Sequence, residues 1–348
     1  MYKLIVRPIL FCFDPELVHN ITFKLIKFFH FIPGFGSLMR FFFLSKNENL
    51  KKDVLGIRFS NPVGLAAGFD KNAKLFSELS NFGFGFIEIG TVTPKAQPGN
   101  PKKRVFRITQ DNGIINRLGI NNDGAEAIIN RLKNNKSIII GGNIGKNTST
   151  PNVKAVEDYL YNFTLLHPYV DYFVVNVSCP NVKEFTQLQD KKFLLDLSKK
   201  MESINTSNAK RKPVLLKISP ELNSDQLDEI IEIINTSSFD GVVATNTTTS
   251  RINLKTNNAK IKAIGNGGLS GKPLKETSNS VIKYLSTKSK KSFPIIGVGG
   301  IHTAEDAIEK LRAGADLVQL YTGFVYEGPS LIRKINKLIL KNQNISTN

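Results

Sequence analysis

Amide, hydroxyl and lysine side chains, interspersed with glycines, follow several short apolar runs of this 348-residue chain. Amides and hydroxyls both donate and accept hydrogen bonds, and the lysines add positive charge. Carboxylates are nearly absent from these positions, Asp70 being the exception, so the paired acids of glycoside hydrolysis or of a catalytic metal site are missing. The combination predicts a site for a planar, anionic ligand held by hydrogen bonds. The positions are Ala66, Ala67, Gly68, Lys71, Thr91, Asn143, residues 176–181, Lys217, Thr245, Asn246, Thr247, Gly299, Gly300, Tyr321, Thr322 and Gly323.

The runs that precede these side chains form a repeating pattern. Short stretches rich in valine and isoleucine alternate with helical patterns, which is typical of βα units in a parallel sheet. Residues 224–235 start with a serine cap, for instance, and residues 303–313 end at Gly314. Eight such units favour a closed eight-stranded parallel (β/α)8 TIM barrel over an open doubly wound sheet, with residues 93–137 as a long insertion. The runs are residues 62–69, 86–92, 138–145, 171–178, 213–220, 241–248, 294–300 and 317–323.

A barrel of this kind would bring the polar positions together, because the carboxyl ends of all its strands form one mouth. The last two runs end in glycines, at residues 296–300 and 321–323. Glycines let backbone N–H groups approach a phosphate, and the start of the following helix adds positive charge. A glycine-rich turn alone is also a common tight turn, but a pair after strands seven and eight is the usual phosphate site of these barrels. The sequence therefore predicts a phosphate-bearing ligand.

Residues 1–45 differ in character, since they are crowded with phenylalanine, leucine and isoleucine. Asp14 and Pro15 predict the start of a helix, and residues 37–44 could form a second, shorter one. Two interpretations remain open: the helices pack on the core, or they dip into a membrane interface with lysines facing anionic headgroups. We expect an N-terminal helical segment at residues 1–45 and the barrel domain at residues 46–340. Apolar side chains recur at helical spacing at Leu17, Ile21, Leu25 and Phe28.

Composition narrows the choice of partners. The net charge is +18, which could attract nucleic acid, an anionic membrane surface or small anionic ligands. The lysines are scattered along the chain and no basic run is interleaved with aromatic residues, so nucleic-acid binding is not expected. As an alternative to any anionic partner, the charge could reflect only a composition rich in lysine and asparagine. The four histidines lack metal-ligand spacing, and no metal is expected. Cys12 and Cys179 are far apart and fit a reducing compartment, and neither a transmembrane run nor a cleaved signal peptide is expected.

Nine motifs in the chain resemble those of the dihydroorotate dehydrogenase family, and they occur in the family's order. The helical segment ahead of the barrel is similar to that of the membrane-associated, quinone-linked class. The resemblance covers almost the whole chain and implies an FMN-dependent enzyme. The motifs are GLAAGFDK (residues 64–71), IEIGTVTP (87–94), QPGN (97–100), NRLGINN (116–122), NIGKN (143–147), NVSCPN (176–181), TNTT (245–248), GGLSG (267–271) and IGVGGI (296–301).

The resemblance also implies which residues bind FMN. Lys217 is the most informative, because a lysine at the end of an apolar strand should face negative charge, and a cation near N1 and O2 of a flavin favours hydride acceptance. A lysine that reaches bulk water is the alternative. The implied cofactor residues are Ala66, Ala67, Gly68, Phe69, Asp70, Thr91, Asn143, Asn176, Lys217, Thr245, Gly271, Gly300, Tyr321 and Thr322.

Dihydroorotate carries one carboxylate and a ring of amide donors and acceptors, which asparagines and one lysine could match. A single asparagine is more often a turn residue or a helix cap, so the prediction depends on their clustering at strand ends. The implied substrate residues are Lys71, Asn116, Arg117, Leu118, Gly119, Ile120, Asn121, Asn176, Asn181, Asn246 and Thr247.

Cys179 stands at the position of the family's catalytic base, which would take the proton from C5 of the substrate. Quinone-linked members typically have serine there, and the soluble class has cysteine. A thiol ionises far more easily than a hydroxyl, so we expect activity to rise as the pH approaches the thiol pKa. A small buried apolar thiol is the alternative. The following residues 182–188 resemble the family's lid, although they lack the proline and glycine of many quinone-linked members. His19, Arg104 and Tyr321 resemble polar residues where quinone meets flavin.

The function implied is oxidation of (S)-dihydroorotate to orotate in de novo pyrimidine biosynthesis, with hydride passing to FMN and electrons to a membrane quinone. The expected location is the cytoplasmic face of the membrane, as a peripheral protein. One alternative is a soluble dihydroorotate dehydrogenase that uses fumarate or NAD, which Cys179 favours and residues 1–45 oppose. Another is a non-catalytic phosphate-binding barrel, which would be purified without a yellow flavin.

Overall fold

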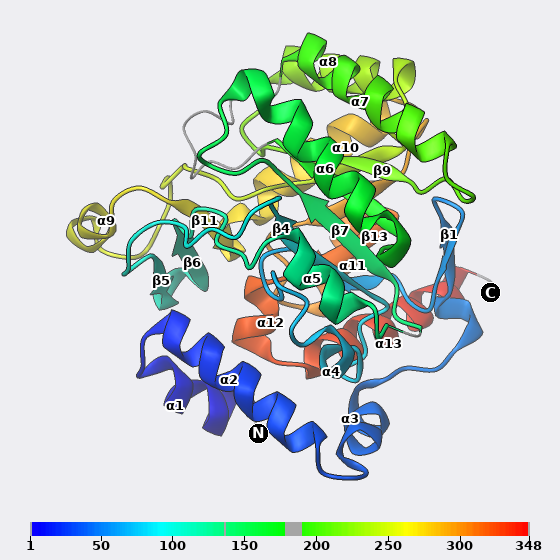
Figure 1. Cartoon of the computed structure of the whole chain (residues 1–348). Coiled ribbons are helices and arrows are strands. Elements are labelled where there is room, and N and C mark those ends of the chain that lie inside the picture. The colour runs from blue at the N-terminus through cyan, green and yellow to red at the C-terminus, as the bar shows by residue number, and fades with distance from the viewer. Residues whose placement is uncertain (1, 136, 178–189, 347–348) are drawn as a thin grey trace.

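A computed structural model describes the chain except for residues 1, 136, 178–189 and 347–348 (Figure 1). Eight strands form a closed barrel in which every neighbouring pair is parallel and the strands follow one another in chain order. Each strand lies within one of the eight runs read from the sequence, so the predicted (β/α)8 fold is confirmed. The barrel strands are β3 (Val63–Leu65), β4 (Phe86–Val92), β7 (Ile140–Ile144), β8 (Tyr172–Asn176), β9 (Val214–Ile218), β10 (Gly241–Ala244), β12 (Ile295–Val298) and β13 (Leu317–Leu320).

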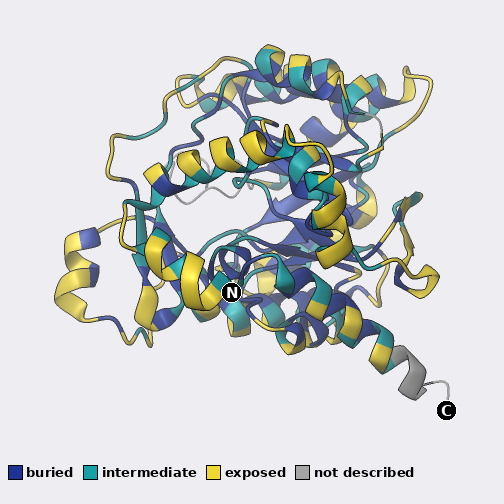
Figure 2. Cartoon of the chain, turned by 90° about the horizontal axis from the view of Figure 1, so that it is seen from below, coloured by how far each residue is buried: buried dark blue, intermediate teal, exposed yellow. Residues whose placement is uncertain are grey.

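Helices surround the barrel, and their inner faces are buried while their outer faces are exposed (Figure 2). The predicted helix over residues 303–313 is observed as α11, with Thr303 as its cap. The cap predicted for α8 is wrong by one residue. Asn223, not Ser224, forms a reciprocal capping box with Gln226, because an amide side chain can accept from the third backbone N–H of the helix. The surrounding helices are α4 (Phe76–Ser80), α5 (Ala125–Leu132), α6 (Ala155–Leu166), α7 (Lys191–Thr206), α8 (Ser224–Thr236), α10 (Lys275–Lys288), α11 (Ala304–Arg312) and α13 (Ser330–Ser346).

The barrel has two hydrophobic layers. One lies between strands and helices, and a smaller cluster fills the interior. Phe86 of β4 and Tyr172 of β8 point inward, and the hairpin of β1 (Lys52–Val54) and β2 (Ile57–Phe59) adds Phe59 from the amino end, with the Phe59 and Phe86 ring centroids 5.1 Å apart. The apolar side chains fill the lower part of the barrel, so the polar interior residues lie nearer the mouth.

Two excursions build the mouth. A three-stranded antiparallel sheet combines β5 (Val105–Ile108) and β6 (Gly113–Asn116) from the predicted insertion with β11 (Gly268–Gly271), which follows β10 in the chain. The helix α9 (Asn258–Ile264) lies beside this sheet, and the short helix α12 (Thr322–Glu327) follows β13 (Figure 1). The carboxyl ends of the strands are therefore covered by segments from distant parts of the sequence.

The N-terminal segment forms helices that pack beside the barrel rather than in it (Figure 1). Both helices predicted there are observed, and Asp14 caps α2 as expected, since its carboxylate accepts from the backbone N–H groups of Glu16 and Leu17 at 3.0 Å each. The helix α2 packs against α3, α4 and β5. Among the described residues, no helix is both long enough and apolar enough to span a bilayer. The elements are a π-helical turn (Tyr2–Val6), α1 (Arg7–Phe11), α2 (Pro15–His30) and α3 (Phe35–Phe43).

Candidate functional site

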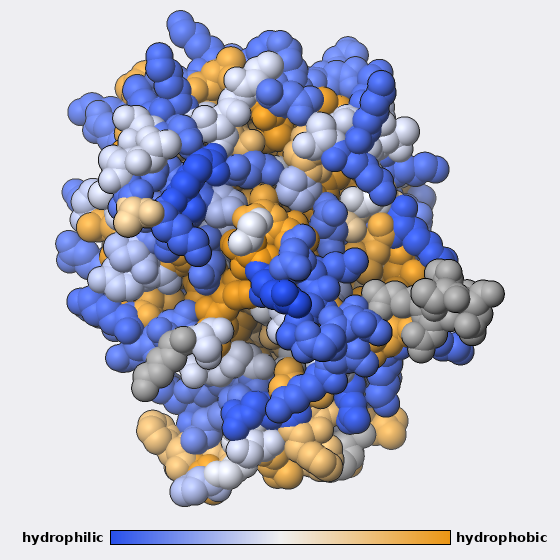
Figure 3. Space-filling view, turned by 90° about the vertical axis from the view of Figure 1, so that its right-hand side faces the viewer, coloured by the Kyte–Doolittle hydropathy of each residue, from blue (hydrophilic) through white to orange (hydrophobic). Residues whose placement is uncertain are grey.

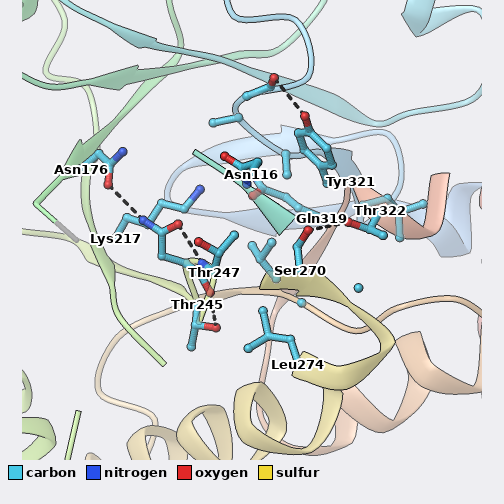
Figure 4. Close-up of a pocket in the computed structure, with 18 of the residues that line it drawn as sticks. Asn116, Asn176, Lys217, Thr245, Thr247, Ser270, Leu274, Gln319, Tyr321 and Thr322 are labelled. Atoms are coloured by element: carbon cyan, nitrogen blue, oxygen red, sulfur yellow. Dashed lines mark hydrogen bonds between the residues drawn. The ribbon is translucent and has the colours of Figure 1, made fainter. Parts of the chain in front are cut away.

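The carboxyl ends of the strands enclose a cavity under the sheet of β5, β6 and β11 (Figure 4). We call it the polar cavity because amide, hydroxyl and lysine side chains from several strands line it. Most of the predicted cofactor and substrate residues line it, although they come from segments up to about 250 residues apart in the chain. The predicted residues that line this cavity are Ala66, Ala67, Gly68, Lys71, Thr91, Asn116, Leu118, Gly119, Ile120, Asn176, Lys217, Thr245, Asn246, Thr247, Gly271, Gly300, Tyr321 and Thr322.

Close backbone packing shapes one side of this cavity. Gly300 has φ +77°, and a Cβ there would lie 2.2 Å from Cα of Lys275, at the start of α10. Gly323 lies equally close, since a Cβ would be 1.8 Å from the carbonyl oxygen of Ile301. The hydroxyl of Thr322 is 2.8 Å from that of Ser270 on β11 (Figure 4). Only glycine fits at these two positions, because a Cβ would overlap neighbouring backbone, and the bare backbone of both lines the cavity beside Thr322. We call this side of the cavity the recess, and its backbone and hydroxyl groups suit a phosphate.

A chain of hydrogen bonds crosses the floor of the cavity. The Asn176 amide donates to the Thr91 hydroxyl at 2.8 Å, and this hydroxyl donates to Oδ1 of Asn143 at 2.6 Å. Asn143 in turn donates to Oε1 of Glu88 at 2.9 Å. Asn143 and Glu88 are completely buried and lie below the cavity lining, so Asn143 supports the residues above it.

Lys217 is the next-to-last residue of β9, and its side chain points into the cavity (Figure 4). It is 6% exposed, and its Nζ atom is 3.7 Å from Oε1 of Glu88. A lysine with this little exposure does not reach bulk water, which removes the alternative left open by the sequence. The cavity therefore has a positively charged group at its floor.

The side of the cavity that holds most of the predicted substrate residues is built from the loop after β3 and from the insertion. The Nζ atom of Lys71 donates to Oδ1 of Asn121 at 2.6 Å. Arg117 points away from the cavity, because its guanidinium donates to the carbonyls of Ile264 and Asn266 and stacks on Phe106 at 4.6 Å. Its neighbours Leu118, Gly119 and Ile120 line the cavity, so this turn contributes backbone and apolar contacts there.

Besides Asn143, two further predicted cofactor residues lie outside the polar cavity. Asp70 is 1% exposed and accepts from the backbone N–H groups of Lys74 and Leu75 at 2.8 and 2.7 Å, so it orders its own loop. Burial raises the pKa of Asp70 to about 6. The Phe69 ring packs between Tyr321 and His19, with centroid separations of 5.7 and 5.3 Å. Phe69 therefore belongs to a second, apolar cavity.

This second cavity of about 410 Å³ lies between α2 and the barrel and is lined mainly by apolar side chains such as Val18, Phe23 and Ile26. His19 lines it, and burial lowers the pKa of His19 to about 4, with a smaller effect of Lys71 in the same direction. The imidazole is therefore neutral at pH 7. The residues Gly68, Lys71, Asn116, Leu118 and Tyr321 line both cavities, so one thin wall separates them.

Arg104 lies beside the second cavity and ties α2 to the insertion. Its Nη2 and Nε atoms donate to the two carboxylate oxygens of Glu16 at 2.7 and 3.1 Å, and Nη1 donates to the carbonyls of Pro98 and Asn100 at 2.7 Å each. The hydrogen bond from Arg104 lowers the pKa of Glu16. Most of the guanidinium N–H groups are therefore already used, two of them to bind α2 and the others to bind the insertion.

Cys179 and Asn181 lie outside the described residues, as do residues 182–188, so the predicted base, substrate contact and lid are not placed. The sequence also missed several lining residues, including Ser270, Leu274 and Gln319. Ser270 stands in a quoted motif, and Gln319 is a polar residue inside an apolar run, which is the one signal that could have identified it. Among the described residues, no cluster of histidine, cysteine or carboxylate side chains could hold a metal.

The family sequence pattern described as dihydroorotate dehydrogenase matches residues 49–342, which is most of the chain and all of the barrel. The chain belongs to the dihydroorotate dehydrogenase family. This confirms the resemblance read from the motifs. Members of the family use a flavin, and the described site fits one: a buried cation, amide and hydroxyl donors, and a glycine-lined recess lie around a single cavity.

Two curated relatives carry the name dihydroorotate dehydrogenase (quinone). The protein from Christiangramia forsetii is 59% identical over 341 residues, which cover 98% of this chain and 99% of that protein. The protein from Thermosynechococcus vestitus is 45% identical over 352 residues, covering 97% and 96%. The crystal structure of an Eimeria tenella dihydroorotate dehydrogenase in complex with ferulenol has a TM-score of 0.86 at 33% identity and covers 96% of this chain and 93% of that one.

Proposed function

We propose that the protein oxidises (S)-dihydroorotate to orotate in pyrimidine synthesis, with FMN at the barrel mouth and a membrane quinone as the final electron acceptor. The observation that carries the proposal is the pair of cavities, one polar and one apolar, that share a wall at Lys71 and Tyr321. A polar substrate and an apolar quinone need different environments, and a flavin at the shared wall would face both. The relatives named above as quinone-linked enzymes support this choice of acceptor.

The residues of the polar cavity suit dihydroorotate. Lys71 supplies the countercharge for its carboxylate, and Asn116, Asn246 and Thr247 offer the donors and acceptors that its amide ring requires. FMN bound there would supply the two-electron acceptor for the hydride from C6 of the substrate and the link to quinone. The Gly300 and Thr322 recess would hold its phosphate, and Lys217 would stabilise negative charge on the ring system.

Cys179 acts in this proposal as the base that removes the proton from C5. The thiolate rather than the thiol accepts that proton, so the rate should increase with pH until the thiol is ionised. We expect Cys179→Ser to slow turnover and to move the rise in rate to higher pH, because a hydroxyl ionises less readily than a thiol. An unchanged rate with an unchanged pH profile would remove Cys179 from this role. Wild-type flavin content in the variant is the control.

The N-terminal segment, residues 1–45, is proposed to form a unit that binds the cytoplasmic membrane surface and admits quinone. It has large apolar side chains that face solvent, among them Phe28, Phe31 and Phe41 at 62, 77 and 76% exposure. Figure 3 shows apolar surface gathered at the lower end of the molecule, where Figure 1 places these helices. Exposed aromatic rings on short helices insert readily into a headgroup region, and nearby lysines would contact anionic lipid.

The first experiment is to purify the protein, release and identify the flavin, and measure dihydroorotate-dependent reduction of a soluble quinone beside fumarate and NAD. We expect bound FMN and fast quinone reduction. Removal of residues 1–45 should abolish quinone reduction but leave flavin bound. Turnover with fumarate or NAD alone would contradict the quinone proposal, and a colourless protein without activity would contradict the whole assignment. Co-flotation with vesicles that contain anionic lipid tests the membrane contact separately.

A further inference from the structure

A completely buried carboxylate lies directly below the polar cavity. Glu88 is in the middle of β4, at 0% exposure, and its side chain points into the barrel. Oε1 accepts from the Asn143 amide at 2.9 Å, and Oε2 accepts from the Gln319 amide at 2.6 Å. Both oxygens accept from amide N–H donors, which is the hydrogen-bonding role of a carboxylate. Glu88 therefore places a negative charge near the barrel axis.

Lys217 is the positive partner of this charge. Its Nζ atom is 3.7 Å from Oε1 of Glu88, and the two residues come from strands on different sides of the barrel. Lys217 lines the polar cavity, whereas Glu88 does not. The ammonium group therefore lies between the buried carboxylate and whatever the cavity holds.

The position of Glu88 has an electrostatic consequence. Charges separated by a few ångströms in a protein interior interact strongly, because neither water nor salt screens them as it would at the surface. The negative charge below Lys217 cancels part of the positive potential that the ammonium group creates in the cavity. The carboxylate also keeps the ammonium group paired when no anion lies above it, and so fixes its position.

We propose that Glu88 is a positioning residue that holds Lys217 at the cavity floor and, through its negative charge, lowers the reduction potential of the flavin bound above. The proposal rests on the proposed function, because it requires a flavin in this cavity. Reduced flavin is richer in electrons than oxidised flavin, so a stronger positive potential favours the reduced form. Removing the charge of Glu88 should therefore make the flavin easier to reduce.

The test is the midpoint potential of the bound flavin, measured by spectrophotometric titration against a reference dye in the purified holoenzyme. Glu88→Gln keeps the shape of the side chain and removes its charge. We expect the preference for reduced over oxidised flavin to increase about tenfold, which is a shift of about 30 mV to more positive potential for a two-electron couple. Glu88→Asp keeps the charge but draws it away from Lys217, so we expect a smaller shift of the same sign.

Asp171→Asn is the matched control. Asp171 is a partly buried carboxylate that accepts from the backbone N–H of Ile140, and it lies at the amino end of the barrel, opposite the cavity. Its removal should leave the potential unchanged. If the Gln variant does not fold, the Asp variant decides the question by itself.

The outcomes separate this inference from the proposed function. Wild-type protein without flavin would contradict the proposed function and this inference with it. Wild-type protein with flavin, and variants whose potential is unchanged or more negative, would overturn this inference alone. An equal shift in Asp171→Asn would also overturn it, because the effect would then not depend on the charge below Lys217.

Discussion

Replacing Arg104 by methionine should loosen the N-terminal helix from the barrel. The guanidinium makes two hydrogen bonds to Glu16 of α2, two to the carbonyls of Pro98 and Asn100 in the insertion, and a longer one of 3.5 Å to that of Leu118. Methionine fills a similar volume but replaces none of these bonds. The side chains of Arg104 and Glu16 are 7 and 17% exposed, so the ion pair is nearly shielded from solvent.

The size of the effect follows from the burial of the pair. Removing one partner of a buried, hydrogen-bonded ion pair typically costs about 3–5 kcal/mol. Glu16 keeps some exposure and has a second cation in Lys102, at 3.9 Å, so we expect the lower end, about 3 kcal/mol. Arg104 lowers the pKa of Glu16 below its ordinary 4.5, so this stabilisation is complete above that pH and is lost as the pH falls. The loss of unfolding free energy caused by Arg104→Met should therefore be largest at pH 7 and smaller in acid.

The measurements are urea unfolding at pH 7 and pH 4, with steady-state kinetics for both substrates. Since α2 lines the apolar cavity, we expect the KM for quinone to rise several-fold while flavin reduction by dihydroorotate in single turnover is nearly unchanged. Lys102→Met is the matched control, because Lys102 faces the same carboxylate but is 69% exposed, and it should change stability by less than about 0.5 kcal/mol. Equal stability of the two variants, or equal effects on both half-reactions, would refute the reasoning.

Three further changes test other parts of the site. Gly300→Ala should weaken flavin binding at least about tenfold, measured by flavin release, because the methyl group would overlap the backbone of Lys275. A wild-type affinity for flavin would contradict the proposal that the recess beside Gly300 holds the phosphate. Burial lowers the pKa of His19 from 6.5 to about 4, so stability should fall as the pH drops from 6.5 towards 4. Between pH 7 and pH 5, the free energy of unfolding measured with urea should therefore fall by about 2 kcal/mol less in His19→Asn than in the wild type. An equal fall in both proteins would contradict this. Lys217→Met should lower the free energy of unfolding by about 3–5 kcal/mol, because it leaves the Glu88 carboxylate without its cation. The double variant with Glu88→Gln should regain most of this stability, and additive losses from the two changes would show that the pair is not coupled.

The sequence by itself determined the order of the elements and the positions of most cavity residues. Apolar runs of strand length that alternate with helical patterns specify βα units, and eight of them specify a closed barrel. The carboxyl ends of parallel strands meet at one mouth, so residues such as Thr91, Asn176 and Thr245 could be placed together without knowing any distance. Asp14 likewise predicted the start of α2, because helix caps depend on local chemistry.

Contacts between distant residues were decided only by the tertiary structure. Glu88 stands inside an apolar run, where burial demands a partner, but nothing in the sequence identifies that partner as Lys217 or Gln319. Asn143 lies one layer below the cavity and Arg117 points away from it, because the direction of each side chain depends on barrel closure and on the packing of α9. Partner choice and side-chain direction depend on how strands and excursions from the whole chain meet in space, and local sequence patterns carry no record of that.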